Sequence, residues 1–341
     1  MRKKILKYKC ITICIINLLT FTSKPVSASD TYFSELTGKE ISIDLINQRP
    51  IAVMIDNEKQ ALPHYGVSEA DIVYEIMNST ANNRITRLMC IYKDWGNVPR
   101  IGSVRSVRTT NIPIAAEYDA LLIHEGGPEL YISEPLKEPW ITDLNGGFSR
   151  LQNGKAKEFT EFVISGEVEE HAKANNASIE YTKYKPNRST HFNFVEKEYQ
   201  LSDKYQAARK GVYLDLSAAF KHNHSELKYN SETNTYDYYV YNELQKDEED
   251  NETISFKNVI LQVADYKELD SSGYLNYEII DSGKGCYLTN GEFISITWEK
   301  ESETEITKYQ NCITKEEIKI NPGKTYIALI PLEYAKHISY R

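Results

Sequence analysis

The sequence predicts an α+β protein, in which an N-terminal α/β sheet domain with helices is followed by a C-terminal antiparallel, β-rich domain. Apolar β-branched runs alternate with helical stretches up to about residue 200, whereas strands separated by turn residues follow one another from residue 225 onward. The 341 residues are 41% hydrophobic, a value typical of globular proteins and too high for a disordered chain. We therefore expect a signal peptide at 1–28, a linker at 29–45, the N-terminal domain at 46–200 and the C-terminal domain at 210–338.

The first 28 residues have the pattern of an export signal. A basic stretch that ends at Lys9 precedes the apolar segment Ile11–Phe21, and the small residues Val26-Ser27-Ala28 form a cleavage site. The apolar segment has 11 residues and is short for a membrane span, which favours cleavage over retention as a membrane anchor. Neither Cys10 nor Cys14 follows a small residue, as a lipid-modified cysteine would. We expect an extracytoplasmic protein that is secreted or associated with the cell envelope.

The charge balance of the chain is acidic. There are 40 Lys and Arg residues against 49 Asp and Glu residues, and cleavage after Ala28 would remove six basic residues and no acidic ones. The net charge would then change from −9 to −15, which argues against nucleic acid as a partner. The sequence carries no familiar catalytic or cofactor motif and no zinc-type cysteine spacing, so we expect no cofactor and no metal. Membrane contact is expected only through the N-terminal segment, if that segment is retained.

Four apolar runs predict the sheet of the N-terminal domain, at 51–56, 71–77, 87–93 and 120–126. Each run is nearly continuous and rich in β-branched or aromatic residues, as in a sheet that is covered on both faces. Helices are expected at 106–118, with Pro113 near the start, and at 155–175, with an interruption near Gly166.

Turn signals separate the predicted strands of the C-terminal domain. Strands are expected at 226–230, 235–242, 258–265, 275–280, on both sides of the Asn290-Gly291 turn within 286–300, and after the Pro322-Gly323 turn at 324–331. The acidic run 246–252 lacks the glycine-bearing spacing of a calcium loop, which favours a solvated loop.

Three cysteines follow the signal segment. Cys90 lies in an apolar run and is expected to be a core residue. Cys286 and Cys312 both lie in the C-terminal domain, and the sequence leaves open whether they form a disulfide.

Polar residues gather where the predicted strands of the N-terminal domain end, which is where ligands bind in sheets covered by helices. These residues are Asp56, Asn57, Glu75, Arg84, Arg87, His124 and Glu125. The glycines that follow Glu125 would allow a positive-φ turn or a close approach of the backbone to a ligand.

The segment 99–111 is the most distinctive, because Arg105 and Arg108 alternate there with Ser103 and Ser106. Arginine forks beside free N–H groups suit a carboxylate or a phosphate. The segment therefore predicts an anion site, and structural salt bridges of these arginines to Asp56, Glu75 or Asp119 are the alternative.

Acid–base chemistry is a second interpretation of the polar residues. His124 beside Glu125, or Asp56 and Glu75 as two carboxylates in different surroundings, could act as acid and base. His191 could fold back onto the first domain, although a simple hydrogen-bonded role is more common for such histidines. His124 and Glu125 would point to opposite faces of a strand, which disfavours a metal shared with His191.

Several ordered blocks give the chain a family resemblance. The N-terminal blocks are RPIAVMIDN, YGVSEADIVYEIM, ITRLMCIY, RIGSVRSVR and YDALLIHEGG, and the C-terminal blocks are NVILQV, GKGCYLTNG, SITWEK and PGKTYIALIP. With these blocks the chain resembles the YerB-like family of exported bacterial proteins, usually lipoproteins, whose domain has no known function. The resemblance implies two domains and an extracytoplasmic location. The chain departs from the family pattern by lacking a lipobox and by the wide separation of Arg150 from His191, which indicates an insertion at 153–185.

Three functions follow from these observations. The first is an envelope protein whose N-terminal domain binds an anionic or amide-bearing ligand, such as a cell-wall fragment, through the residues named above. The second is an enzyme that cleaves envelope glycans or peptides. The third is a protein-interaction module without a ligand site.

Overall fold

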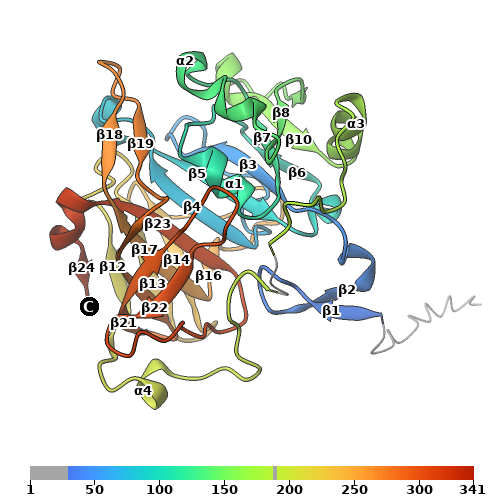
Figure 1. Ribbon diagram of the computed structural model, residues 1–341. Coiled ribbons are helices and arrows are strands. Elements are labelled where there is room, and N and C mark those ends of the chain that lie inside the picture. Colours follow the sequence, from blue (N-terminus) through green and yellow to red (C-terminus); the bar gives the residue numbers. More distant parts are fainter. Residues whose placement is uncertain (1–29, 187–189) are drawn as a thin grey trace, which may run out of the picture.

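A computed structural model describes residues 30–186 and 190–341, so the predicted export signal lies outside the described residues (Figure 1). Its central element is an eleven-stranded mixed sheet, in the order β11-β21-β20-β17-β23-β4-β5-β3-β7-β8 with β22 beside β21. The N-terminal half contributes β3 (Ile51–Asp56), β4 (Ile72–Met77), β5 (Thr86–Tyr92), β7 (Leu121–His124) and β8 (Thr142–Asn145). The C-terminal half contributes β11 (Arg209–Lys210), β17 (Asn258–Ala264), β20 (Ser282–Thr289), β21 (Glu292–Glu299), β22 (Lys308–Asn311) and β23 (Thr325–Pro331).

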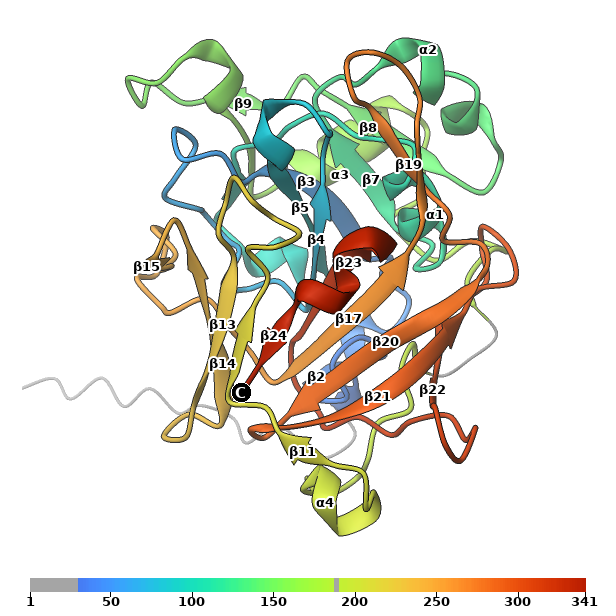
Figure 2. The same cartoon turned by 90° about the vertical axis from the view of Figure 1, so that its left-hand side faces the viewer.

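The two halves of the chain meet inside this sheet. Strand β4 runs parallel to β23, and residues 72–76 pair with residues 325–329. In both views the blue-to-green strands β3, β5, β7 and β8 lie above the orange strands β17 and β21 (Figures 1 and 2). The backbone hydrogen bonds between β4 and β23 therefore join the N-terminal half to the C-terminal half.

The four strands predicted in the N-terminal half are confirmed. Every residue of β3, β4, β5 and β7 is buried, as expected for a sheet covered on both faces. Strand β5 is antiparallel to both β3 and β4, whereas β3, β7 and β8 run parallel to one another. This mixed arrangement brings the end of β3, the end of β4 and the start of β5 to one edge of the sheet.

The predicted helices are shorter than expected. Of the helix predicted at 106–118, only α1 (Asn111–Ala116) forms, with Pro113 in its first turn. The helix predicted at 155–175 is wrong in its first half, where β10 (Glu161–Ile164) pairs with β6 (Arg100–Gly102) and β9 (Ser149–Arg150). Phe162, Val163 and Ile164 favour a strand locally, and pairing with β6 fixes that choice. Helix α3 (Glu167–Ala174) follows, and α2 (Glu129–Ile132) and α4 (Leu201–Lys204) are single turns.

A second sheet of six strands packs in the C-terminal half. Its strands are β12 (Tyr213–Asp215), β13 (Glu226–Asn230), β14 (Thr235–Val240), β15 (Glu243–Leu244), β16 (Ser255–Phe256) and β24 (Ser339–Tyr340). Both predicted hairpins are confirmed, β13–β14 here and β20–β21 in the large sheet. Asn290 and Gly291 both have positive φ, as the two-residue turn between β20 and β21 requires. Among the described residues, no helix is long and apolar enough to span a membrane.

Two further hairpins contribute to sites described below. Strands β18 (Tyr266–Glu268) and β19 (Leu275–Tyr277) form an arm of the C-terminal half that reaches the N-terminal half (Figures 1 and 2). There the backbone N–H of Tyr277 donates to the hydroxyl of Thr110 at 2.9 Å. The segment expected to be a linker at 29–45 contains the hairpin of β1 (Thr31–Phe33) and β2 (Glu40–Ser42).

The acidic run at 246–252 is not simply a solvated loop. Asp247 is buried, and its carboxylate accepts the backbone N–H groups of Gly66 at 2.9 Å and Ser68 at 3.0 Å. The rest of the run is more exposed, but Asp247 anchors it to the N-terminal half. The pattern of charge alone did not indicate this contact, because it joins residues about 180 positions apart.

All three cysteines that the structure describes are free. Cys286 pairs with Ser295 of β21, and the N–H of Cys312 donates to the carbonyl oxygen of Ser295 from the opposite side. Strand β21 therefore lies between the two cysteines. Two strand spacings amount to about 10 Å, which exceeds the Cα separation of about 7 Å that a disulfide can bridge.

Candidate functional site

The segment 99–111, which the sequence predicts to bind an anion and which we call the anion segment, lies between two strand ends. Beyond their first three residues, the parallel strands β3 and β7 diverge, and residues 103–107 run between them. On one side the N–H of Asp56 donates to the carbonyl oxygen of Ser103 at 3.0 Å, and on the other the N–H of Glu125 donates to that of Arg105 at 3.0 Å. The segment is thereby held at the carboxyl ends of parallel strands, where open α/β sheets bind their ligands.

The turn after β7 uses the two glycines that the sequence singled out. Gly126 has a φ of 66°, a conformation that favours glycine. A Cβ on Gly127 would lie 2.5 Å from the side chain of Ile132 and 3.0 Å from the carbonyl oxygen of Val107. The turn therefore packs directly against the anion segment at Gly127, whereas Gly126 provides the positive φ.

Arg105 is held by carboxylates. Its Nε lies 2.6 Å from Oδ2 of the buried Asp56, and one of its terminal nitrogens lies 3.1 Å from Oε2 of Glu158. For this arginine the structural salt bridge, which the sequence left as an alternative, is what the structure contains. The guanidinium of Arg105 is already paired with two carboxylates and has little free charge for a ligand.

Arg87 and Arg108 have different surroundings. Arg87 stands opposite Asp56 in the β3–β5 register and donates to the carbonyl oxygen of Ser106 at 2.8 Å. Arg108 donates to the carbonyl oxygen of Val107 at 2.8 Å, and its guanidinium lies over the ring of Tyr274, 4.9 Å from the centroid. Within residues 30–186 and 190–341, no carboxylate oxygen lies within 4 Å of either guanidinium. We call Arg87 and Arg108 the arginine pair.

The arginine pair carries an excess of buried positive charge. Burial lowers the pKa of Arg108 to about 9, and repulsion from Arg87 acts in the same direction. Burial also lowers the pKa of Arg87 to about 10, with Asp56 opposing this shift and Arg105 adding to it. Both groups stay protonated at neutral pH, because these pKa values remain well above 7. An anion beside the pair would relieve the repulsion.

A small cavity separates the arginine pair from the β18–β19 arm. Its volume is about 10 Å³, close to the space that one water needs. The lining residues are Ile76, Met77, Asn78, Arg87, Arg108, Thr110, Asn111, Leu275 and Tyr277. Sequence reasoning missed Asn78, Thr110 and Asn111, although they stand at a strand end and in the anion segment. No local sequence pattern marks Leu275 and Tyr277 as site residues, because they follow Arg108 by about 170 positions in the sequence.

Glu75 and Asn57 lie in a buried hydrogen-bond network where the two halves of the chain contact each other. The Glu75 carboxylate is fully buried and accepts hydrogen bonds from five donors. They are Asn57 at 3.2 Å, Thr86 at 2.6 Å, Ser225 at 2.6 Å, Tyr238 at 2.7 Å and Tyr326 at 2.6 Å. Burial raises the pKa of Glu75, and the hydroxyl donors oppose that shift without reversing it. A carboxylate enclosed in this way has no access to a substrate.

His124 and Glu125, at the end of β7 and directly after it, have separate partners. His124 is fully buried, with Nδ1 2.8 Å from the carbonyl oxygen of Gly126 and Nε2 2.7 Å from Oδ1 of Asp143. Glu125 is half-exposed and pairs with Arg150 at 2.6 Å, which also pairs with the buried Glu161 at 2.5 Å. Both ring nitrogens of His124 have other hydrogen-bond partners, so the structure does not place His124 and Glu125 together as an acid–base pair.

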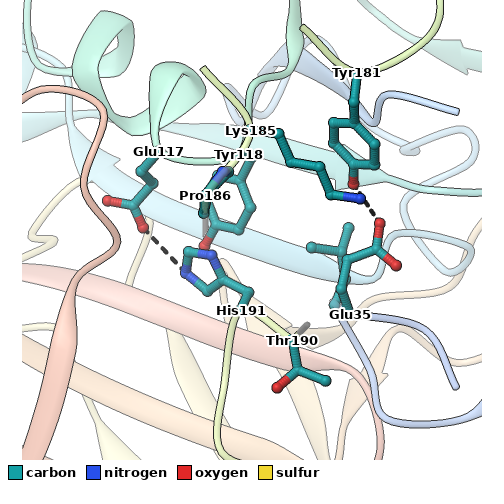
Figure 3. A pocket seen from close by; sticks show the side chains of 9 residues that line it. Glu35, Glu117, Tyr118, Tyr181, Lys185, Pro186, Thr190 and His191 are labelled. Carbon is teal, nitrogen blue, oxygen red and sulfur yellow. Dashed lines mark hydrogen bonds and ion pairs between the residues drawn. The ribbon is translucent and has the colours of Figure 1, made fainter. Parts of the chain in front are cut away.

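Arg84 and His191 lie away from the arginine pair. Arg84 donates to the carbonyl oxygen of Ala218 at 3.0 Å and stacks on Tyr334. His191 lies 3.2 Å from Glu117 and stacks on Tyr118, in a pocket whose other side holds Glu35 and Tyr181 (Figure 3). The cavity there measures about 20 Å³. His191 thus does fold back onto the first domain, but as part of a buried ion-pair network.

Comparison with known proteins places these features in a family. Two family models match the chain: the N-terminal domain of the "Protein of unknown function (DUF3048)" at residues 36–180 and its C-terminal domain at 216–327. A protein of Bacillus subtilis (strain 168) named "Putative lipoprotein YerB" is 23% identical over 314 residues, which covers 87% of this chain and 85% of that protein. The crystal structure of the YerB protein from Bacillus subtilis superimposes with a TM-score of 0.75 at 20% identity, covering 91% of this chain and 99% of the other. These matches confirm the family resemblance and the α+β fold.

Proposed function

This chain belongs to the DUF3048 family of two-domain proteins, and from that premise we propose that it is an extracytoplasmic protein of the cell envelope whose N-terminal domain binds an anionic ligand at the arginine pair. The relative named a putative lipoprotein supports the envelope location. The predicted export signal at residues 1–28 is consistent with the same location.

The observation that carries the proposal is the imbalance of charge around Arg87 and Arg108. Two guanidinium groups face a cavity without a carboxylate within 4 Å among the described residues, while Asp56 is already paired with Arg105. Buried arginine is normally paired, because the interior solvates a lone charge poorly. A carboxylate or phosphate oxygen at the cavity would supply the missing partner and accept hydrogen bonds from both guanidinium groups.

The size of the cavity defines how such a ligand would bind. A volume of about 10 Å³ admits one anionic oxygen in place of a water, so the body of the ligand would lie outside, beside the β18–β19 arm. In the envelope, a cell-wall fragment with an acidic sugar has this character. N-acetylmuramic acid is a suitable probe because N-acetylglucosamine shares its ring and amide and lacks only the carboxylate-bearing ether.

The test is a thermal-shift titration of the purified chain with the two sugars. N-acetylmuramic acid should raise the melting temperature, since a ligand that binds only the folded state stabilises it, and N-acetylglucosamine should not. Inorganic phosphate serves as a third probe for a simple anion. Arg108→Gln should abolish the shift, because it removes one of the two facing charges.

Arg209→Gln is the matched control, since Arg209 is exposed and distant from the arginine pair. This variant should keep the full shift with N-acetylmuramic acid. An equal shift in Arg108→Gln, or no shift with any of the three probes in the unmodified protein, would overturn the proposal. Circular dichroism of each variant distinguishes loss of binding from loss of folding.

A further inference from the structure

A larger hollow lies at the opposite end of β4 from the arginine pair. It consists of two adjoining cavities of about 320 and 330 Å³, which share Lys39, Gly323 and Lys324 in their walls. Gly323 and Lys324 precede β23, and Lys39 comes from the β1–β2 hairpin. The N–H of Gly323 donates to the carbonyl oxygen of Thr37 at 2.8 Å and so fixes the hairpin beside the hollow. We call this pair of cavities the hairpin groove.

One cavity of the hairpin groove is acidic. Glu69, Asp71 and Asp94 line it, together with Tyr92. Oδ2 of Asp71 accepts the N–H of Lys93 at 2.6 Å, and the other oxygen accepts no hydrogen bond from the residues that the structure describes. The Tyr92 hydroxyl is buried next to the Cys90 thiol. This cavity therefore has an unused acceptor, the second carboxylate oxygen of Asp71.

The other cavity is basic and rich in hydroxyl groups. Lys39 is exposed and has no ion pair in the described part of the chain, whereas Lys257 is paired with Glu198 at 2.7 Å. Thr233, Thr235 and Ser255 add hydroxyl groups to the same wall. The middle of the groove is held by Lys324, whose ammonium donates to the carbonyl oxygen of Ser68. Lys39 lines both cavities, so the free positive charge lies where the two cavities meet, whereas the carboxylate of Asp71 lies in the acidic cavity.

We infer that the hairpin groove binds a zwitterionic ligand, with a primary ammonium group against Asp71 and a carboxylate or phosphate against Lys39. The polar body of the ligand, which can be a hydroxylated sugar or a short peptide, would extend past Lys39 toward the hydroxyl groups of the second cavity. Cavities of this volume hold ligands of small-molecule size, unlike the water-sized cavity at the arginine pair. The inference does not depend on the proposed function, because it uses other residues at the other end of the strand.

The surroundings of Asp71 agree with this assignment. Burial raises the pKa of Asp71 to about 7, although the N–H of Lys93 and the charge of Lys324 oppose the shift. A carboxylate that is this poorly solvated gains more from a bound ammonium group than an exposed one does. Perturbed carboxylates in a cavity are typical of binding and catalytic sites.

Isothermal titration calorimetry of the purified chain tests the inference with four probes. Glucosamine 6-phosphate and trialanine carry both charges, on a sugar and on a peptide. Glucose 6-phosphate lacks the ammonium group, and glucosamine lacks the anion. At least one of the two zwitterions should bind ten times more tightly than either singly charged sugar, and the one that binds identifies the body of the ligand.

Two variants locate the binding in the hairpin groove. Asp71→Asn preserves the acceptor for Lys93 and should weaken zwitterion binding at least tenfold, and the exposed Lys39→Ala should weaken it several-fold. Lys173→Ala, on the exposed face of α3, is the control and should bind as the unmodified chain does, as should Arg108→Gln. Binding that survives both groove variants, or no heat of binding with either zwitterion at millimolar concentration, would overturn the inference.

Discussion

The two halves of the molecule meet at two buried carboxylates that have opposite surroundings. Glu75 on β4 is surrounded by neutral donors, among them Ser225 and Tyr326 from the C-terminal half. Glu117, directly after α1, is paired with the ammonium of Lys300 at 2.8 Å and with His191 at 3.2 Å. Both carboxylates are at most 1% exposed. We call the first contact the neutral seam and the second the ionic seam.

The difference shows that burial alone does not set the behaviour of a carboxylate. Burial raises the pKa of Glu75, because the hydroxyl donors compensate only part of the lost hydration. Burial also acts to raise the pKa of Glu117, but Lys300 and His191 outweigh it and hold the pKa at about 2. Removing the charge of Glu75 should therefore cost the protein little stability, whereas removing a charge from the ionic seam should cost much more.

The largest effect is expected when the ionic seam loses its cation. Lys300→Met leaves the buried Glu117 with His191 and the hydroxyl groups of Thr307 and Tyr74, and breaking a buried pair in this way costs about 3–5 kcal/mol. Denaturant unfolding at pH 7 measures the loss. The paired change Lys300→Met with Glu117→Gln should recover part of it, since the buried carboxylate that lost its cation is then replaced by a neutral amide.

Lys308→Met is the matched control for this prediction. Lys308 pairs with Glu301 at 2.7 Å on the surface, where such pairs contribute less than about 1 kcal/mol. A loss in Lys300→Met no larger than that in Lys308→Met would show that the ionic seam does not depend on its charge.

The pH dependence of stability gives the second largest effect. The pKa of Glu117 is about 2 in the folded state against an ordinary value of 4.5, so its contribution is present above pH 4.5 and is lost as the pH falls toward 2. At about 1.4 kcal/mol per pKa unit, the loss is on the order of 3 kcal/mol. Glu75 affects stability in the opposite direction. Its pKa is raised in the folded state, so the stability that it contributes at low pH is lost as the pH rises above the ordinary pKa of a glutamate.

Unfolding free energies between pH 2.5 and 6 separate these two contributions. The double variant Lys300→Met with Glu117→Gln should lose less stability than the unmodified chain as the pH falls. Equal acid sensitivity of the two proteins would contradict the assignment of the acid-labile contribution to the ionic seam.

A smaller effect is expected at the neutral seam. Glu75→Gln keeps an oxygen acceptor for some of the hydroxyl donors, and the other hydroxyls can rotate to accept from the new amide. The cost should be about 2 kcal/mol at pH 7, because the size is conserved and no charge is left unpaired. The midpoint of urea unfolding checks this value. A loss larger than that of Lys300→Met would reverse the comparison between the seams.

Much of the fold could be predicted because its signals are local. The apolar runs at β3, β4, β5 and β7, and the Asn290-Gly291 turn, each depend on neighbouring residues. The pairing of β4 with β23 and the strand β10 could not be found, since both depend on partners distant in sequence. Local propensity fails where a distant strand decides the outcome.

The predicted site residues also divide into those whose positions depend on local structure and those whose surroundings depend on distant segments. Asp56, Ser103, Ser106 and the three arginines of the anion segment and β5 do lie together, because strand ends and one loop determine their positions. The side chains of Glu75, His124 and His191 are enclosed by partners from distant segments, among them Tyr326, Asp143 and Glu117. Sequence shows that a residue is polar and stands at a strand end, but not whether a distant segment covers it.

The smallest effects compare one hydroxyl donor from each seam. Ser225 donates to Glu75 at 2.6 Å, and Thr307 donates to Glu117 at 2.9 Å. Among the described residues, Glu75 accepts hydrogen bonds from neutral donors alone, whereas Lys300 and His191 already stabilise Glu117. Ser225→Ala should therefore cost about 1.5 kcal/mol and Thr307→Val about 0.5 kcal/mol. Parallel urea unfolding of the two variants at pH 7 measures this difference. If Thr307→Val were the more damaging change, Lys300 and His191 would stabilise Glu117 less than its low pKa implies.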